Sequence, residues 1–482
     1  MKQLTVLIFL LLNSLGSFAL DVSFSHCSFN SQQGPYLESY IHVIGSTVSF
    51  IDVEGGQKQA SVEVLIIIKD GEKIVAFDKY NLHSPLTATT VNFVDQKTYL
   101  LPSGRYTIEL EVRDNHQEGN EVKMNSNAVL EFEENQFGQS DIQLLGAYSK
   151  TDREGPMIKN GYFLETLPFN FYNKKASKLA FYLEIYNSDK IVQEEFLVRY
   201  YIDQLGDNST KKTVKLGHKK RMPKAVNVVM LQMDIQGLPS GNYFLTVEIR
   251  DRNNELLSSR EVYFQRSNPF LDTKNLAEVA TEDEFVNELD SASLVYGLKA
   301  IAMHISARDG EVLNMILKER KNKAMRGFLF RYWAAKNPNS PKLAYERYME
   351  VARAADKTFE SGFGYGFESD RGNIFMKYGK PNDIVRVDNE LDAPPYEIWV
   401  YETFPFTNQS RVKFLFYNPT LGAGAFRLLH SDCRAEINNP QWEVELYRDA
   451  APESINNETN YVDATRVTDS FTRRARRIWE DI

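Results

Sequence analysis

The side chains of this chain that could do chemistry gather in one stretch, SGFGYGFESDRG, residues 361–372. Glu368 and Asp370 are two positions apart, and Arg371 follows directly. On a strand, residues i and i+2 share a face, and two carboxylates on one face form the acid–base pair that glycoside hydrolysis uses. Glu397 is a third carboxylate that could complete such a pair. One hypothesis is therefore a hydrolytic site of Asp370 with Glu368 or Glu397.

A structural role for the same residues is the alternative, and we favour it. Carboxylates two positions apart share a face on almost any strand, so the spacing carries little information. Asp370 could cap or tie a turn, while Arg371 pairs with a carboxylate such as Glu397. Since no second catalytic group stands at a recognisable spacing, we assign no catalytic residue.

Other chemistries lack their motifs. The seven histidines are scattered, and the sequence has no His-Glu-x-x-His pattern and no metal-spaced cysteines. A nucleophile elbow and a phosphate-binding loop are also missing, and Gly362, Gly364 and Gly366 are spaced wrongly for a dinucleotide fingerprint. We therefore expect neither a metal nor a cofactor.

Three ordered signatures connect this block to a family. They are Gly366-Phe367-Glu368-Ser369-Asp370, Tyr378-Gly379-Lys380-Pro381 and Pro395-Tyr396-Glu397-Ile398-Trp399. Over about residues 325–447 the chain resembles the GWxTD domain of exported bacterial proteins. Phe367 replaces the family's Trp and Ser369 its Thr, which keeps an aromatic filler and a hydroxyl. The resemblance implies a domain and a compartment, but no reaction.

The block predicts both a contact surface and a scaffold for it. Glycines alternating with aromatic residues indicate a tight backbone with packed rings. We expect the contact residues to be Phe363, Tyr365, Phe367, Asp370, Arg371 and Lys380, and the structural ones to be Gly366, Gly372 and Trp399. The segment NIFMKYG and the runs after it read as strands, so residues 361–450 should form a small α+β domain with an antiparallel sheet.

Helical patterns precede this domain, over residues 270–360. A capping box of Thr281 and Glu284 predicts a helix from about residue 285, and a second helix should run through 310–335. Ser340 and Pro341 should begin a third.

A repeated corner marks the first half of the chain. LPSGRYTIELEVRD, residues 101–114, returns as LPSGNYFLTVEIRD, residues 238–251. Each copy is a tight turn followed by an alternating strand, and each resembles the tyrosine corner of immunoglobulin-like sandwiches. Tyr106 and Tyr243 should therefore be structural. We expect a multidomain chain that begins with two tandem all-β, immunoglobulin-like sandwiches, residues 20–136 and 140–266.

The N-terminus, residues 1–19, has the charged, apolar and small-x-small regions of a cleaved signal peptide. No later segment is apolar enough to span a membrane, so we expect no transmembrane segment after cleavage. In an exported protein Cys27 and Cys433 could form a disulfide, or each could be a buried thiol. The spacing leaves both open.

A net charge of −9 makes nucleic acid an improbable partner. One segment departs from this acidic balance: the tail, residues 451–482, has a basic cluster of Arg473, Arg474, Arg476 and Arg477 beside Trp479. A helix there could dock on an acidic partner or an anionic surface, or it could pack on its own domain.

Together with the signal peptide, the resemblance to the GWxTD family implies a protein of the bacterial cell envelope, in the periplasm or associated with the outer membrane, and the absence of catalytic motifs favours a non-enzymatic role. The sandwiches would be binding or spacer arms, and the GWxTD-like domain a contact head for an envelope protein or glycan. The alternative is an envelope hydrolase acting on glycan or peptide. A glycan binder using the sandwiches would need an aromatic platform on one sheet face.

Overall fold

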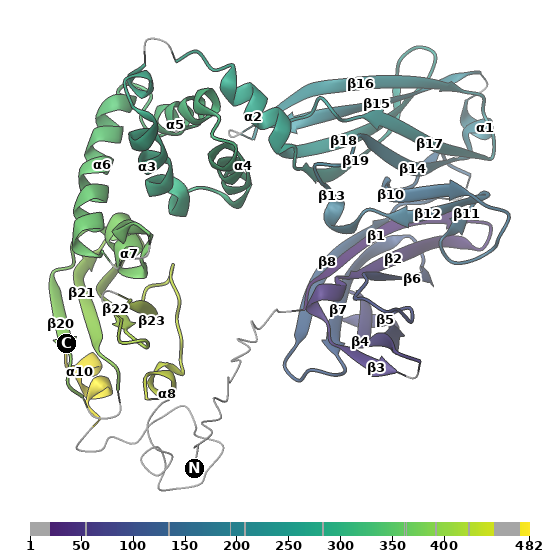
Figure 1. Ribbon diagram of the computed structural model, residues 1–482. Helices are drawn as coiled ribbons and strands as arrows, with labels where there is room; N and C mark the ends of the chain where they lie inside the picture. Colours follow the sequence, from purple (N-terminus) through teal and green to yellow (C-terminus); the bar gives the residue numbers. More distant parts are fainter. Residues whose placement is uncertain are drawn as a thin grey trace, which may run out of the picture. The chain divides into compact units, whose positions relative to one another are not determined.

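The computed structural model describes residues 20–447 and 473–482, except 54, 134, 193, 207–208, 282–283, 361, 363, 391–392 and 423–424. The chain divides into two compact units between Leu271 and Asp272 (Figure 1). The expected signal peptide, Phe363 and most of the expected tail lie outside the described residues. No helix among the described residues is long and apolar enough to cross a membrane.

Unit 1 begins with two packed sheets. One holds β1 (Val22–Ser31), β2 (Gly34–Val43) and β6 (Phe93–Leu100), and the other holds β3 (Phe50–Val53), β4 (Gln57–Asp70), β5 (Lys73–His83), β7 (Gly104–Asp114) and β8 (Glu121–Leu130). Alternate residues of β4, from Val62 to Ile68, are fully buried. They share a core with Leu37 and Ile41 of β2, so the two sheets pack face to face.

A second pair of sheets follows in the same unit. The first contains β9 (Gly138–Gln139), β10 (Gln143–Lys150), β11 (Ile158–Lys159), β12 (Tyr162–Thr166), β14 (Lys178–Tyr186) and β17 (Val226–Asp234). The second contains β13 (Phe171–Tyr172), β15 (Phe196–Leu205), β16 (Lys211–Arg221), β18 (Gly241–Arg250) and β19 (Leu256–Arg266), and α1 (Ser188–Ile191) follows β14. Phe181 of β14 and Leu245 of β18 belong to one core between these sheets.

The repeated corner has the same geometry in both copies. The Tyr106 hydroxyl donates to the Pro102 carbonyl at 2.8 Å, and the Tyr243 hydroxyl donates to the Pro239 carbonyl at 2.8 Å. Each bond fixes the turn to the strand that leaves it, β7 or β18.

Polar and aromatic contacts join the two sandwiches. The Ser28 amide and hydroxyl both donate to Asp141 at 2.7 Å, and His42 bonds Thr166 at 2.7 Å. Lys159 reaches across to Glu38 at 2.5 Å and lies 3.3 Å from the centre of the Phe29 ring. A buried ammonium is costly without such a partner. Polar as well as apolar contacts therefore fix how the two sandwiches pack against each other.

Unit 2 opens with helices: α2 (Pro269–Ala277), which the unit boundary divides, then α3 (Ser291–Ile301), α4 (Ala307–Lys318), α5 (Asn322–Lys336) and α6 (Pro341–Thr358). α6 begins at Pro341 as expected, but two other expectations were wrong. The first long helix starts at Ser291, because Asp290 caps it by accepting from the Ser293 amide at 2.7 Å. The run through 310–335 is two helices, because the backbone turns at Arg320, where φ is 50°.

A four-stranded antiparallel sheet completes the unit, in the order β20 (Asp383–Val387), β21 (Tyr396–Phe404), β22 (Gln409–Tyr417) and β23 (Arg427–Ser431). One face packs on the helices through Trp399 and Phe414. The other face, with Ile398, packs on α8 (Trp442–Leu446) and α10 (Ala475–Asp481). The segment NIFMKYG, expected to be a strand, is part of helix α7 (Asp370–Tyr378).

Each of the two cysteines is buried within its own unit. Cys27 is a free thiol buried in unit 1 among Phe29 and Tyr40, and Cys433 is a free thiol buried in the core of unit 2. The pairing of the two cysteines stays a hypothesis, and burial raises the pKa of the Cys27 thiol well above its usual range.

Candidate functional site

The motif segment, residues 364–372, is a 3-10 turn that leads into a helix. The turn covers Gly366–Glu368, and α7 follows with Ser369 as its N-cap. The Ser369 hydroxyl accepts from the Gly372 amide at 3.1 Å and donates to the Gly366 carbonyl at 2.6 Å. Because a threonine hydroxyl can make the same two bonds, Ser369 is equivalent to the family's Thr.

Two glycines of the segment lie where no side chain fits. A Cβ on Gly366 would stand 2.3 Å from the Asp356 carbonyl oxygen, and one on Gly372 would stand 2.0 Å from the Gly366 carbonyl oxygen. The turn is thus pressed against the end of α6 and against the first turn of α7. Because glycine has no Cβ, the backbone of the turn can approach these carbonyl groups closely.

Asp356, at the end of α6, anchors the turn. Its carboxylate accepts from the Gly366 amide at 2.6 Å and from the Tyr296 hydroxyl at 3.0 Å. Sequence reasoning missed Asp356, because a single aspartate on the polar side of a helix carries no signal of such a role.

The aromatic residues of the segment form a cluster with α3. The Tyr365 ring stacks on Phe367 at 5.1 Å, and Tyr296 meets both rings edge-on. Phe367 is only 2% exposed, so it is a core residue and not the surface contact that we expected. Tyr365 is half-buried, with the Lys299 ammonium 5.0 Å from its ring centre.

Arg371 is also buried, which corrects its expected place on a contact surface. Its guanidinium donates to Glu397 at 3.1 Å and lies 4.1 Å from the centre of the Phe426 ring. Burial lowers the pKa of Arg371, and the Glu397 carboxylate opposes that shift. Arg386 reaches the same Glu397 oxygen at 3.0 Å, and the Trp399 indole donates to the other at 3.1 Å. Glu397 therefore serves as the buried counter-charge that holds α7 on the sheet.

The other two acidic candidates have different partners. Glu368 accepts from the Tyr365 amide at 2.8 Å and pairs with Lys299 at 3.5 Å. Asp370 is exposed and accepts from the Leu428 amide at 2.8 Å, which ties α7 to β23. Glu368, Asp370 and Glu397 are each held in a separate interaction, and Lys380 is exposed in the turn after Gly379.

Metal ligands do not gather here. Within the described part of the chain, no group of three or more His, Cys, Asp or Glu side chains could hold a metal ion.

The C-terminal helix packs on its own domain. Trp479 lies against His430 and Trp442, with ring centres 5.0 and 5.9 Å apart, and Arg476 pairs with Glu443 at 2.9 Å. Arg473 is buried beside the Tyr447 ring. Of the four arginines in the tail, Arg473 and Arg476 are therefore used within unit 2.

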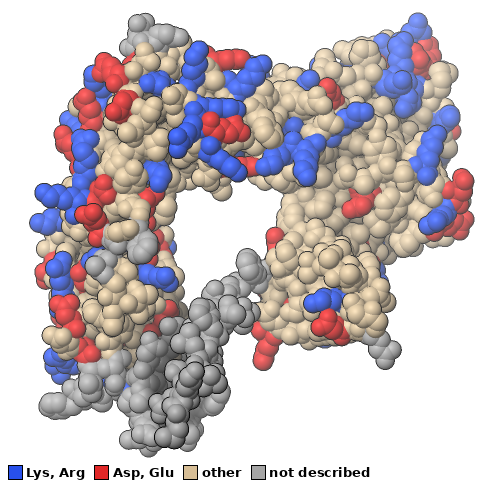
Figure 2. All heavy atoms as spheres, in the orientation of Figure 1, with Lys and Arg blue, Asp and Glu red and all other residues tan. Residues whose placement is uncertain are grey.

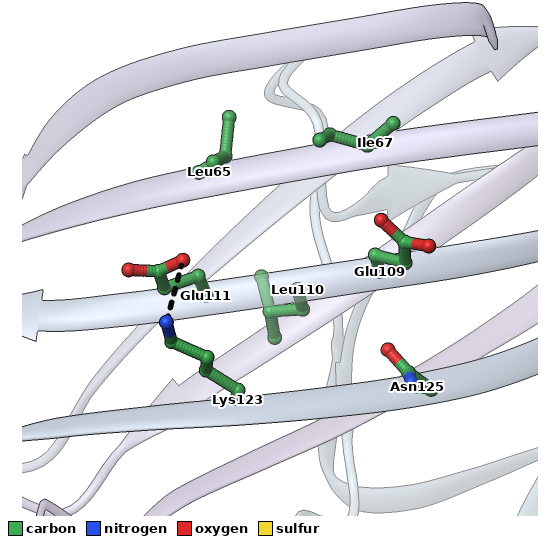
Figure 3. A pocket seen from close by; sticks show the side chains of 7 residues that line it. All are labelled: Leu65, Ile67, Glu109, Leu110, Glu111, Lys123 and Asn125. Atoms are coloured by element: carbon green, nitrogen blue, oxygen red, sulfur yellow. Dashed lines mark ion pairs between the residues drawn. The ribbon is translucent and has the colours of Figure 1, made fainter.

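Surface hollows occur on unit 1. The one in Figure 3 lies on the outer face of β4, β7 and β8 and has a volume of about 140 Å³. Its charged groups are already paired, since Glu111 meets Lys123 at 3.5 Å and Glu109 meets Lys69 at 2.5 Å. At this volume and with these pairs it is a surface groove, not a ligand site.

Comparison with known proteins gives one family match. Residues 263–440 match the family described as the GWxTD domain. No curated protein matches the chain. Among solved structures, red sea bream transglutaminase matches at 10% identity over 51% of this chain and 31% of that chain, with a TM-score of 0.17. A score this low carries no argument about fold or activity.

Proposed function

We propose that this chain, a member of the GWxTD domain-containing protein family, is a non-enzymatic interaction component of a bacterial cell envelope. Unit 2 would be the contact head, and unit 1 would carry it as a binding or spacer arm. The observation that supports this most is that every charged side chain suggested for catalysis has a structural partner of its own. Export to the envelope remains a prediction from residues 1–19.

The hydrolase alternative loses its support in this arrangement. Glu397 is 4% exposed and is held by two guanidiniums and an indole, so both of its oxygens are engaged within the domain. Glu368 and Asp370 each accept from a backbone amide in a different part of the domain. An acid–base pair must converge on one reacting group, whereas these three carboxylates are each held by different partners.

The contact surface that we propose is the motif rim, defined here as Tyr365, Glu368 and Lys299. These side chains are partly exposed, come from two elements and stand on the rigid aromatic cluster below them. A half-buried ring flanked by a cation and an anion is the kind of anchor that protein interfaces use. Asp370 and Lys380, both exposed, extend the same region of the sequence.

We also infer that both sandwiches are immunoglobulin-like. The paired hydroxyl-to-proline bonds of Tyr106 and Tyr243 support this, since such a bond is the mark of the tyrosine corner. That architecture fits the proposed role of unit 1 as a binding or spacer arm.

The test is affinity capture of the tagged full chain from gently solubilised envelope. The variant K299Q/E368Q removes both rim charges but keeps an acceptor for the Tyr365 amide. Its matched control is K342Q/E288Q, which removes an exposed pair of the same unit, 3.2 Å apart. We expect the first variant to lose a stoichiometric partner that the control retains, while both keep the melting temperature of the native chain. Equal capture by both variants would rule out the rim as the contact surface.

A further inference from the structure

A hollow in the second sandwich of unit 1 is larger than the one in Figure 3 and is built differently. β10 pairs with β14 only from Gln143 to Leu145, and the two strands then separate. β10 also has an irregular register with β12 between Leu145 and Ala147. The hollow opens where the strands part, and its volume of about 430 Å³ is within the range of ligand sites.

The floor of the hollow is fixed before any ligand arrives. Leu145, Tyr172 and Ala180 line it and are all buried, between 2% and 5% exposed. Because they belong to the cores of the sandwich and of its joint, their positions are held by packing. A ligand would therefore meet a preformed surface.

The walls carry two partly exposed aromatic rings. Tyr148 is 36% exposed and Phe171 is 39% exposed, and both line the hollow. Tyr148 is oriented by a hydrogen bond with the Gln232 side chain. The negative face of an aromatic ring attracts polarised C–H groups, such as those on the flat face of a pyranose.

The rim of the hollow is positively charged. Lys175 and Lys178 line it, both are exposed, and neither forms an ion pair with any described residue. No Asp or Glu is among the described residues that line the hollow, although the whole chain carries a net charge of −9. Asn173 and Gln232 add amides that can bond hydroxyl groups.

We propose that this hollow binds an acidic saccharide, with Tyr148 and Phe171 against the sugar rings and Lys175 and Lys178 on the carboxylate. Uncharged sugars would use only the rings and amides. This goes beyond the contact function proposed for unit 2, because the hollow lies wholly in unit 1 and needs no residue of the motif rim.

The experiment is titration calorimetry on the full chain with two acidic probes, trigalacturonate and the disaccharide of N-acetylglucosamine and N-acetylmuramate. The methyl ester of trigalacturonate, which has the same rings without charge, is the ligand control. K175Q/K178Q is the test variant, and K212Q/K215Q, which removes two β16 lysines that form no ion pair with described residues, is its matched control.

We expect at least one acidic probe to bind the native chain, and K175Q/K178Q to raise its Kd at least tenfold, since charge-assisted bonds are lost. The control variant should leave the Kd unchanged. F171A should raise the Kd of the acidic probe without changing how that Kd depends on salt concentration. The methyl ester should bind at least tenfold more weakly than trigalacturonate if that probe binds. The proposal is overturned if neither acidic probe binds at millimolar concentration, or if K175Q/K178Q and its control bind equally well.

Discussion

At the scale of single residues, the motif is defined by what its side chains hold in place. Arg371 and Glu397 are a buried pair, with side chains 9% and 6% exposed, whereas Arg386 meets the same carboxylate from a side chain 63% exposed. Truncating one partner of a buried pair leaves the other charge without compensation, but removing an exposed partner costs little.

R371A should therefore lower the free energy of unfolding of unit 2 by about 3–5 kcal/mol, and R386A by about 1 kcal/mol or less. Urea unfolding followed by tryptophan fluorescence measures this selectively, because Trp333, Trp399, Trp442 and Trp479 are the four tryptophans and all lie in unit 2. Equal losses in the two variants would show that Arg371 is not the buried anchor.

Gly372 gives a second test at this scale, with Gly310 as its matched helical control. A Cβ at Gly372 would collide with a backbone carbonyl, whereas one at Gly310 of α4 meets nothing within 4 Å. G372A should destabilise unit 2 by more than about 2 kcal/mol, and G310A should stabilise it by about 0.5–1 kcal/mol. The same fluorescence measurement separates them, and a tolerated G372A would contradict the close approach.

At the scale of elements, the sequence predicted strands better than helix boundaries. The repeated corner was readable because turn residues and strict alternation stand side by side. NIFMKYG was misread, because Ile374, Met376 and Tyr378 alternate as on a strand, although Ile374 and Tyr378 also share a helical face. Ser369, whose hydroxyl caps α7, decides between them.

The late start of α3 is set by the local cap at Asp290, which the sequence analysis overlooked, whereas the positive φ at Arg320 carries no local sequence signal. The same holds for the site. The sequence offered the Arg371–Glu397 pair as one option among several. Asp356 and Lys299 reach the motif from other helices, and nothing in the sequence indicated that they would.

The joint between the sandwiches should respond to acid. His42 of β2 is buried against Thr166 of β12, and burial lowers its pKa to about 4, from 6.5. Between these values the unfolded chain binds a proton that the folded chain does not, so the stability of unit 1 falls as the pH falls from about 6.5 to about 4. The loss from His42 should approach about 3 kcal/mol.

Urea unfolding of unit 1 at several pH values, followed by circular dichroism, measures this slope. H42Q, which keeps a hydrogen-bonding group for Thr166, should flatten it. Some slope should remain, because burial also lowers the pKa of His26 on β1. An unchanged slope in H42Q would show that His42 does not titrate on unfolding.

At the scale of the whole molecule, the chain consists of two units that are built differently. Unit 1 is built of strands joined by a specific polar contact, and unit 2 carries the family motif on helices and a small sheet. Surface charge follows no such division, since acidic and basic side chains are interspersed over the face shown in Figure 2. The interaction that we propose would therefore depend on a particular surface, the motif rim, and not on the electrostatic field of the whole chain.

The most direct test of the proposed contact surface is photo-cross-linking in intact cells with a benzoylphenylalanine at position 365 of the motif rim. Position 343, an exposed leucine on α6 of the same unit, is the control. We predict one defined adduct from position 365 and none of that mass from position 343. No adduct from position 365 in a stably folded, normally expressed chain, or the same adduct from both positions, would contradict the claim that the motif rim is a contact surface.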